Sequence, residues 1–335
     1  NALGVVVSST LSGTLTNNRG GEISASAAAT NGTAIAYGVY IGNLNGTLTN
    51  AGSISAAATG DTVKNYSVQA NFGTGNVNNL ADGLLSGNIY IGGTVAVSNA
   101  GTIAIPATAY GATADNGTGD NSKRGYIADN YTQLATGELQ FGVISSAAYG
   151  QLRVGGTADL TASNTISIRV PVVNTLHAND VLDNVFSAGN WIGLNSGASV
   201  NVRSVNIVGA PLFRFSGVED THGNIDITVN SASSFSSLYS SLGSLGGTLD
   251  GLVGSYGTGN SAMDAMLDKL YGLGSTAELN DAIKQLQPGM AAGGAQVTAD
   301  TLGGTNNVIL ARLDESRGMA SGDDFVTNRK AWIKP

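Results

Sequence analysis

The sequence predicts a mainly β protein: a right-handed parallel β-helix (solenoid) followed by a short α-helical linker region. Three observations lead to this fold class: a neutral, glycine-rich composition, a repeated strand–corner–strand unit, and a switch to helical periodicity after residue 260. Charged residues make up 11% of the 335 residues, 48 residues are glycine and none is cysteine. Soluble domains carry roughly 25% charged residues. Asn, Thr and Ser must therefore solvate this chain, as in stacked strands.

A unit of two short strands around a corner recurs in the first hundred residues. Its copies are TLTNAGSISA (47–56), VAVSNAGTIA (95–104) and TLTNNRGGEISA (14–25). A second element, VYIGN (39–43), returns as IYIGG (89–93). Apolar and small polar residues alternate around these copies, which is the period of short strands. A unit this short buries its apolar face only by stacking on its neighbours, so the repeat predicts a solenoid.

The corner of the unit gives three expectations. Leu48 and Ile54 lie on either side of the corner NAG (50–52) and are expected to point into the core. The Asn and Gly are expected to supply left-handed backbone conformations for the bend. Stacked corners would also let Asn50 and Asn99 form a ladder of side-chain amides. At roughly 20–25 residues per coil, residues 1–230 make about ten coils.

The composition changes near residue 231, and the period becomes helical near residue 260. Residues 231–259 are rich in Ser, Gly and Leu, which is typical of a linker. A first helix begins at a capping Ser261 and places Met and Leu side chains at i, i+3, i+4 and i+7. A second helix begins with the capping box of Ser275 and Glu278. Residues 296–316, rich in small residues, are expected to form a third.

Five stretches resemble the C-terminal end of bacterial autotransporter passengers. They are YGQLRVGGTADL (149–160), LHANDVLDNVFSA (176–188), LYGLGS (270–275) with QLQPGM (285–290), RLDESRG (312–318) and AWIKP (331–335). In the second stretch, Asn179 precedes Asp180 where the family usually has Gly-Asp, a change compatible with the same turn. The matches cover roughly residues 140–335. Upstream, only the composition and the repeats are similar to the family.

The resemblance implies an order of domains. It consists of β-helix repeats at 1–140, the last coils with a folding-nucleus module at 141–230, a Ser/Gly-rich linker at 231–259, a helical linker at 260–318 and the start of a missing outer-membrane barrel at 319–335. It also implies type V secretion and display at the cell surface of a Gram-negative bacterium, with the chain's own C-terminal barrel in the precursor. The start at Asn1, without a leader, fits a removed signal peptide or a fragment.

The lack of cysteine agrees with this export route. Small secreted folds usually use disulfides, but a disulfide loop would obstruct an unfolded chain that is threaded through a barrel. It also excludes thiol catalysis, zinc–thiolate sites and iron–sulfur sites.

The sequence assigns no catalytic, cofactor-binding or metal-binding residue. His177 is close in sequence to Asp180 and Asp183, but a corner of the folding-nucleus module is the favoured interpretation, and His222 is expected in a polar turn. No serine elbow of the G-x-S-x-G type with His and Asp partners occurs, and no P-loop lysine follows a glycine-rich segment.

Two further groups of side chains are candidate sites. Asp115, Asp120 and Asp129 could bind calcium in a loop, but their spacing does not match an EF-hand. The tyrosines of the repeats either decorate an outer face or stack in the core, and the core is the favoured location. They are Tyr37, Tyr40, Tyr66, Tyr90 and Tyr110.

The charge argues against a nucleic-acid partner. The net charge is −8 and the isoelectric point about 4.6, whereas phosphate binding needs clustered Lys and Arg. Only the pairs Lys123-Arg124 and Arg329-Lys330 occur, and both are expected to be solvated surface.

The leading hypothesis is an adhesin or a self-associating structural protein rather than an enzyme. Side-by-side solenoids can pair through Asn, Thr and Ser ladders, and open strand edges can recruit another copy end to end. The result would be cell aggregation or a surface fibre, with a second copy, a neighbouring cell or a host surface as partner. The alternatives are an enzymatic passenger, with a hydrolase site split between coils, and an inert stalk that presents a missing N-terminal domain.

Overall fold

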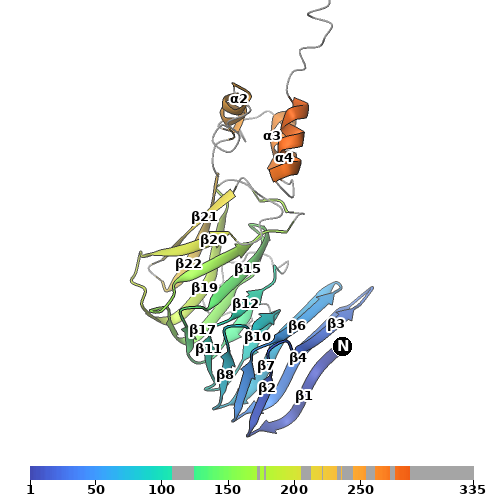
Figure 1. The fold of residues 1–335 in the computed structure, drawn as a ribbon, viewed down its shortest axis with the longest axis vertical. Helices are drawn as coiled ribbons and strands as arrows, with labels where there is room; N and C mark the ends of the chain where they lie inside the picture. The colour runs from blue at the N-terminus through green and yellow to red at the C-terminus, as the bar shows by residue number, and fades with distance from the viewer. Residues whose placement is uncertain are drawn as a thin grey trace, which may run out of the picture. The chain divides into compact units, whose positions relative to one another are not determined.

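The computed structural model describes residues 1–107, 124–171, 174–176, 179–204, 213–220, 222–231, 235, 244–253, 261–271 and 276–286. Most of these residues form β-strands that are wound into a β-solenoid (Figure 1). The prediction of a mainly β solenoid is therefore confirmed.

Three stacks of strands form the walls of the solenoid. The first wall consists of β1 (Ala2–Leu11), β4 (Thr33–Leu44), β7 (Thr62–Gly73), β10 (Asn88–Ile91), β13 (Gly125–Ile127), β17 (Leu152–Asp159) and β19 (Val181–Ile192). The second wall consists of β2 (Thr14–Asn17), β5 (Thr47–Asn50), β8 (Asn76–Asn79), β11 (Ala96–Asn99) and β14 (Tyr131–Gln133). The third wall consists of β3 (Glu22–Ala28), β6 (Ser53–Thr59), β9 (Leu84–Ser86), β12 (Thr102–Ile105), β15 (Glu138–Ser145), β18 (Thr165–Arg169) and β20 (Ser199–Ser204).

Strands within each wall pair in parallel. The first wall contains six successive parallel pairings, from β1–β4 to β17–β19, so the solenoid has about six turns. The expectation of ten coils is wrong because the coils are longer and less regular than the repeat suggested. Equivalent corner residues are separated by 33, 29, 20 and 34 positions along the chain.

A ladder of buried asparagines runs through the corner between the second and third walls. The side-chain Nδ2 atoms of Asn17, Asn50 and Asn79 donate to the Oδ1 atoms of Asn50, Asn79 and Asn99, each at 2.8 Å. Asn99 continues the series to the Oε1 atom of Gln133 at 3.5 Å. The predicted amide ladder is thus confirmed, with Asn79 as the rung between Asn50 and Asn99.

The corner glycines have a different role from the one expected. Gly52 and Gly101 do not adopt a positive φ. A Cβ atom on Gly52 would lie 2.2 Å from the carbonyl oxygen of Gly21 in the coil below, and one on Gly101 would lie 2.2 Å from that of Gly83. Glycine is therefore needed because stacked backbones approach closely at the corner, and the expected left-handed conformation at this position is wrong.

Alternating apolar side chains fill the interior. Leu48 and Ile54, predicted to point inward, are both 0% exposed, and the largest fully buried side chains include Tyr131, Phe141 and Phe186. Beside this core, β3 and β6 project as a flat extension (Figure 1). A cluster of small side chains packs its sheets together. They are Ala2, Ala25, Ala27, Ala36, Ala56 and Ala58.

The pairing changes after the last coil. β22 (Asn224–Ser231) pairs antiparallel with β19, and β21 (Phe213–Glu219) pairs antiparallel with both β20 and β22. A short strand, β16 (Ala148–Tyr149), also pairs antiparallel with β15. These antiparallel strands meet the β19 end of the solenoid.

Three helices follow in the described part of the chain: α2 (Ser244–Val253), α3 (Ser261–Tyr271) and α4 (Thr276–Leu286). The starts of α3 and α4 agree with the predicted caps, although Ser275 lies outside the described residues. α2 lies in the stretch expected to be a linker, where Leu245 and Leu249 already have helical spacing. The third helix predicted at 296–316 lies outside the described residues.

The chain falls into two compact units, Asn1–Asp281 and Ala282–Pro335, and only residues 282–286 of the second are described. Among the described helices, none combines the length and the apolar character that crossing a membrane requires.

Candidate functional site

The outer side of the first wall carries a row of tyrosines. In β4, Val39 and Ile41 are fully buried, so Tyr40 between them points outward. The same alternation in β10 and β13 turns Tyr90 and Tyr126 outward, and all three side chains are half-buried. The interpretation that the repeat tyrosines stack in the core is therefore wrong for Tyr40 and Tyr90, whereas Tyr66 is buried, with 4% of its surface exposed. Tyr110 lies outside the described residues.

The rings of this row contact one another from coil to coil. Tyr37 stacks on Tyr66 with ring centroids 5.9 Å apart. Tyr66 meets Tyr90 edge-on at 6.3 Å, and Tyr90 meets Tyr126 at 5.7 Å. Tyr40 packs edge-on against Tyr37 at 5.5 Å. Such contacts stabilise the outer face by about 0.5–1.5 kcal/mol per pair beyond the buried area.

Amide side chains lie beside the rings. The Nδ2 atom of Asn71 donates to the hydroxyl of Tyr40 at 2.9 Å, and the Nε2 atom of Gln69 donates to the Oδ1 atom of Asn71 at 2.7 Å. Three large apolar side chains on the same wall, Leu3, Val6 and Phe72, are 54%, 47% and 67% exposed. The face therefore combines aromatic, amide and apolar groups.

The row continues from the tyrosines to an arginine. Tyr90 is paired with Tyr126, Tyr126 with Arg153, and Arg153 with Ser187. Leu152 and Val154 are buried on either side of Arg153, so its side chain points outward like the rings before it. Among the described residues, none forms a hydrogen bond or an ion pair with the Arg153 guanidinium.

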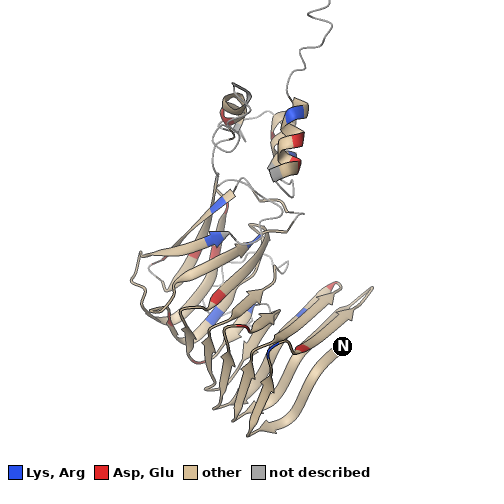
Figure 2. Ribbon diagram, viewed as in Figure 1, with Lys and Arg blue, Asp and Glu red and all other residues tan. Residues whose placement is uncertain are grey.

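A groove of about 680 Å³ opens at Arg153. It lies over β17, β19 and the turn before β22. Its lining residues are Arg153, Val154, Gly155, Asn184, Ser187, Ala188, Gly189, Asp220, His222 and Asn224. Charged groups are sparse along the described solenoid (Figure 2), and Arg153 is the only charged residue in its row.

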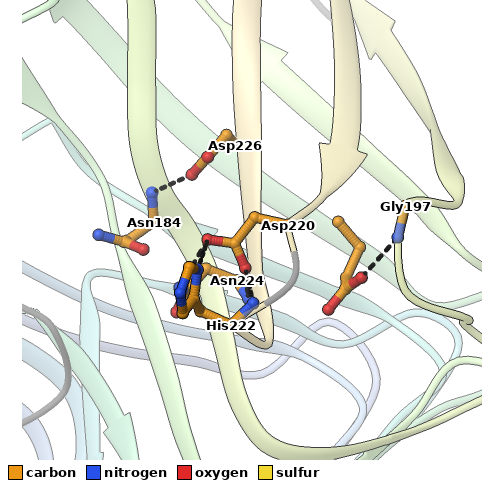
Figure 3. Close-up of polar contacts among 7 residues, drawn as sticks. Asn184, Gly197, Asp220, His222, Asn224 and Asp226 are labelled. Carbon is orange, nitrogen blue, oxygen red and sulfur yellow. Dashed lines mark hydrogen bonds and ion pairs between the residues drawn. The ribbon is translucent and has the colours of Figure 1, made fainter.

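The turn between β21 and β22 forms one side of the groove, and Figure 3 shows how Asp220 organises it. The Oδ1 atom of Asp220 accepts from the backbone N–H groups of His222, at 2.7 Å, and Asn224, at 2.9 Å. Its Oδ2 atom accepts from the Nδ2 atom of Asn224 at 3.0 Å. Burial alone would raise the pKa of Asp220, but the hydrogen bonds from Asn224 and His222 outweigh it and hold the pKa below its usual value.

Asp220 is therefore a structural carboxylate. The His222 side chain is 81% exposed, and its Nδ1 atom lies 3.6 Å from the Oδ2 atom of Asp220. That distance exceeds a hydrogen bond, and the carboxylate oxygens are occupied by the turn. The pair lacks the geometry of a general base held by an acid, and the prediction of a polar turn at His222 is confirmed.

Two further carboxylates bind backbone N–H groups nearby (Figure 3). Asp226 accepts from the N–H of Asn184 at 2.7 Å, where Asn184 has a φ of 54°, and Glu219 accepts from the N–H of Gly197 at 2.9 Å. Burial raises the pKa of Asp226, and the charges of Asp220 and Asp183 add to that rise, while the Asn184 hydrogen bond opposes it.

The other candidates from the sequence do not assemble into a site. His177, Asp115 and Asp120 lie outside the described residues, while Asp129 is half-buried in the turn after β13. The described part of the chain contains no group of three or more His, Cys, Asp or Glu residues that could hold a metal ion. Arg124, expected on the solvated surface, is only 5% exposed, and its neighbour in sequence lies outside the described residues.

The sequence analysis did not single out Arg153. Its signal was the pattern Leu152-Arg153-Val154, which matches Ile89-Tyr90-Ile91 and places one outward side chain between two inward apolar ones.

No family model matches this chain, and no curated protein is detectably similar to it. The β-solenoid and its faces are therefore the features that bear on function.

Proposed function

We propose that this chain is the surface-displayed passenger of an autotransporter of a Gram-negative bacterium, and that it acts as an adhesin or a self-associating structural protein. The proposal includes a right-handed winding of the solenoid and a linker role for α2, α3 and α4. The β-solenoid is compatible with such a passenger without being specific to it. Support for the export route comes from the resemblance of the C-terminal stretches and from the lack of cysteine.

The observation that carries self-association is the uncharged outer face of the second wall. Buried Leu48, Val77 and Val97 alternate with outward polar side chains. The outward side chains form two rows across the coils. One row is Thr14, Thr47, Asn76 and Ala96, and the other is Thr16, Thr49, Asn78, Ser98 and Thr132.

Two such faces can pair side by side. Hydroxyl and amide groups both donate and accept, so every side chain of the two rows except Ala96 offers hydrogen bonds to the identical side chain of a second copy. Each hydrogen bond contributes only about 1 kcal/mol net, but several act together along the wall. Among the described residues, the one charged side chain in line with these rows is Asp159, which is paired with Thr132 in the next coil, so the association is expected to depend little on salt.

The test places like charges on this face. The double substitution Thr16→Lys with Thr49→Lys should abolish self-association of the purified protein in sedimentation velocity and the clumping of cells that display it. Ser24→Lys with Ser55→Lys is the matched control, since these paired residues lie on the outer side of the third wall. A wild-type protein that stays monomeric at high concentration and leaves cells dispersed would refute the proposal. Equal effects of the two double substitutions would refute the role of this face.

A further inference from the structure

We infer that the outer side of the first wall is a binding track for an acidic polysaccharide, in which Tyr90 and Tyr126 contact sugar rings and Arg153 binds a carboxylate. The inference rests on the adhesive function proposed above and names the chemical class of its ligand.

The geometry favours a linear ligand. Tyr90, Tyr126, Arg153 and Ser187 occupy the same position in successive coils, because each is paired with the next. Neighbouring strands are about 4.8 Å apart, so the four side chains form a straight line along the solenoid. The line leads into the groove of about 680 Å³, which is within the usual size of small-ligand pockets.

The chemistry of the line favours a sugar chain. Sugar rings present C–H groups on their faces and hydroxyl groups at their edges. The π face of a tyrosine ring is electron-rich and attracts weakly positive C–H groups, while its hydroxyl remains available for hydrogen bonds. The amide groups of Gln69 and Asn71, joined to each other and to Tyr40, offer further donors and acceptors for sugar hydroxyls.

The charge favours an acidic sugar. Arg153 is the only charged side chain in its row, and no described residue pairs with its guanidinium. Asp220, the carboxylate that lines the groove, already accepts three hydrogen bonds within its own turn. A ligand carboxylate can therefore form a two-pronged pair with Arg153 without breaking an existing ion pair.

A second copy of this face is a poorer occupant. The row offers aromatic rings, amides, a serine and one arginine, but no carboxylate to pair with Arg153. Ring packing alone explains why tyrosines follow one another from coil to coil. It does not explain why an unpaired arginine over a groove follows the tyrosines in the row.

The experiment uses two ligands that differ only in charge. An oligogalacturonate of about eight residues carries a carboxylate on each sugar, and its methyl ester is the uncharged control. Binding of each to the full chain is measured by calorimetry at low and high salt. We expect the acid to bind about tenfold more tightly than the ester, because a charge-assisted hydrogen bond is present only with the acid, and to weaken with salt.

Three variants locate the site. Arg153→Gln should weaken binding of the acid about tenfold and leave the ester unchanged. Tyr126→Ser should weaken binding of both ligands, with the melting temperature reporting whether the fold persists. Arg203→Gln is the matched control, since Arg203 is an exposed arginine on the third wall, and it should bind like the wild type.

Three results would overturn the inference: no binding of the acid, equal binding of acid and ester, or equal losses in Arg153→Gln and Arg203→Gln. Free galacturonate that binds as tightly as the oligomer would overturn the track and leave a site for a small anion. Sedimentation without ligand tests self-association separately. A protein that self-associates but does not bind the acid would therefore refute only this inference. A protein that binds the acid but stays monomeric would refute only self-association.

Discussion

The asparagine ladder predicts that Asn79 contributes more to stability than its size suggests. Asn79 accepts from Asn50, and its Nδ2 atom donates to Asn99 at 2.8 Å and to the carbonyl oxygen of Thr102 at 3.1 Å. In Asn79→Ala the Oδ1 atom of Asn99 loses its donor while fully buried. One unsatisfied buried polar group costs about 1–3 kcal/mol, and the lost bonds from Asn50 and to Thr102 add to it. We expect a loss of about 2–4 kcal/mol.

Asn17→Ala is the matched control at the first rung. Its removal leaves Asn50 with a second donor, the backbone N–H of Gly52 at 3.3 Å, so the expected loss is about 1 kcal/mol. The free energies are compared through guanidinium chloride unfolding followed by circular dichroism. If Asn17→Ala is destabilised as much as Asn79→Ala, the unsatisfied oxygen of Asn99 is not the cause of the larger loss.

The direction of the hydrogen bonds in the ladder, from each donor to the next acceptor, gives a more specific prediction. Asn79→Asp keeps the shape but replaces the donor to Asn99 by a second acceptor and buries a charge, so at neutral pH it should be less stable than Asn79→Ala. Burial raises the folded-state pKa of such a carboxyl above its unfolded value. Its stability is therefore highest at low pH, where a protonated oxygen can donate again, and is lost as the pH rises through the folded pKa. A variant equally stable at pH 3 and pH 7, relative to wild type, would contradict this reasoning.

Three further predictions concern single positions. Gly52→Ala should lower stability by about 1–3 kcal/mol, since the new Cβ would lie 2.2 Å from the Gly21 carbonyl oxygen. Gly13→Ala is the control: its new Cβ would have no atom within 4 Å, so it should be neutral or stabilising in the same unfolding assay. Asp226→Asn should raise the melting temperature at pH 7 but not below pH 3, because burial raises the pKa of Asp226, so ionisation weakens the fold as the pH rises. Asn184→Val should cost about 1–2 kcal/mol because Asn184 has a φ of 54°, and Asn184→Gly should stay close to wild type.

The sequence predicted the coil but not its length. The identical corners at 50–52 and 99–101 predicted stacked coils and an amide ladder, and both are present. Asn79 was missed because its corner, NLADG (79–83), carries two extra residues before the glycine. A local sequence pattern indicates which residues form a corner. The number of residues between successive corners depends instead on the length of the strands in each wall. That distance varies from 20 to 34 residues, so the number of turns was overestimated.

The location of the tyrosines could have been predicted. In Val39-Tyr40-Ile41 the two β-branched residues occupy one side of the strand, which places the ring on the other. The groove could not have been predicted. It brings Arg153 and Asp220 together across strands that pair antiparallel, and no sequence repeat relates these two residues. Likewise, Asp220 and Asn224 resemble any polar turn until the fold brings them beside β17.

Because one corner holds the coils in register, the perimeter of each turn is free to change. A stretch between two equivalent asparagines, such as 50–78, could be deleted and Asn17 would meet Asn79 as it now meets Asn50. Lengthening a wall costs little chain entropy, since loop closure depends only weakly on length. Such a scaffold can gain, lose or widen whole turns during evolution while its lattice of amides stays continuous, so relatives of very different lengths could share one architecture.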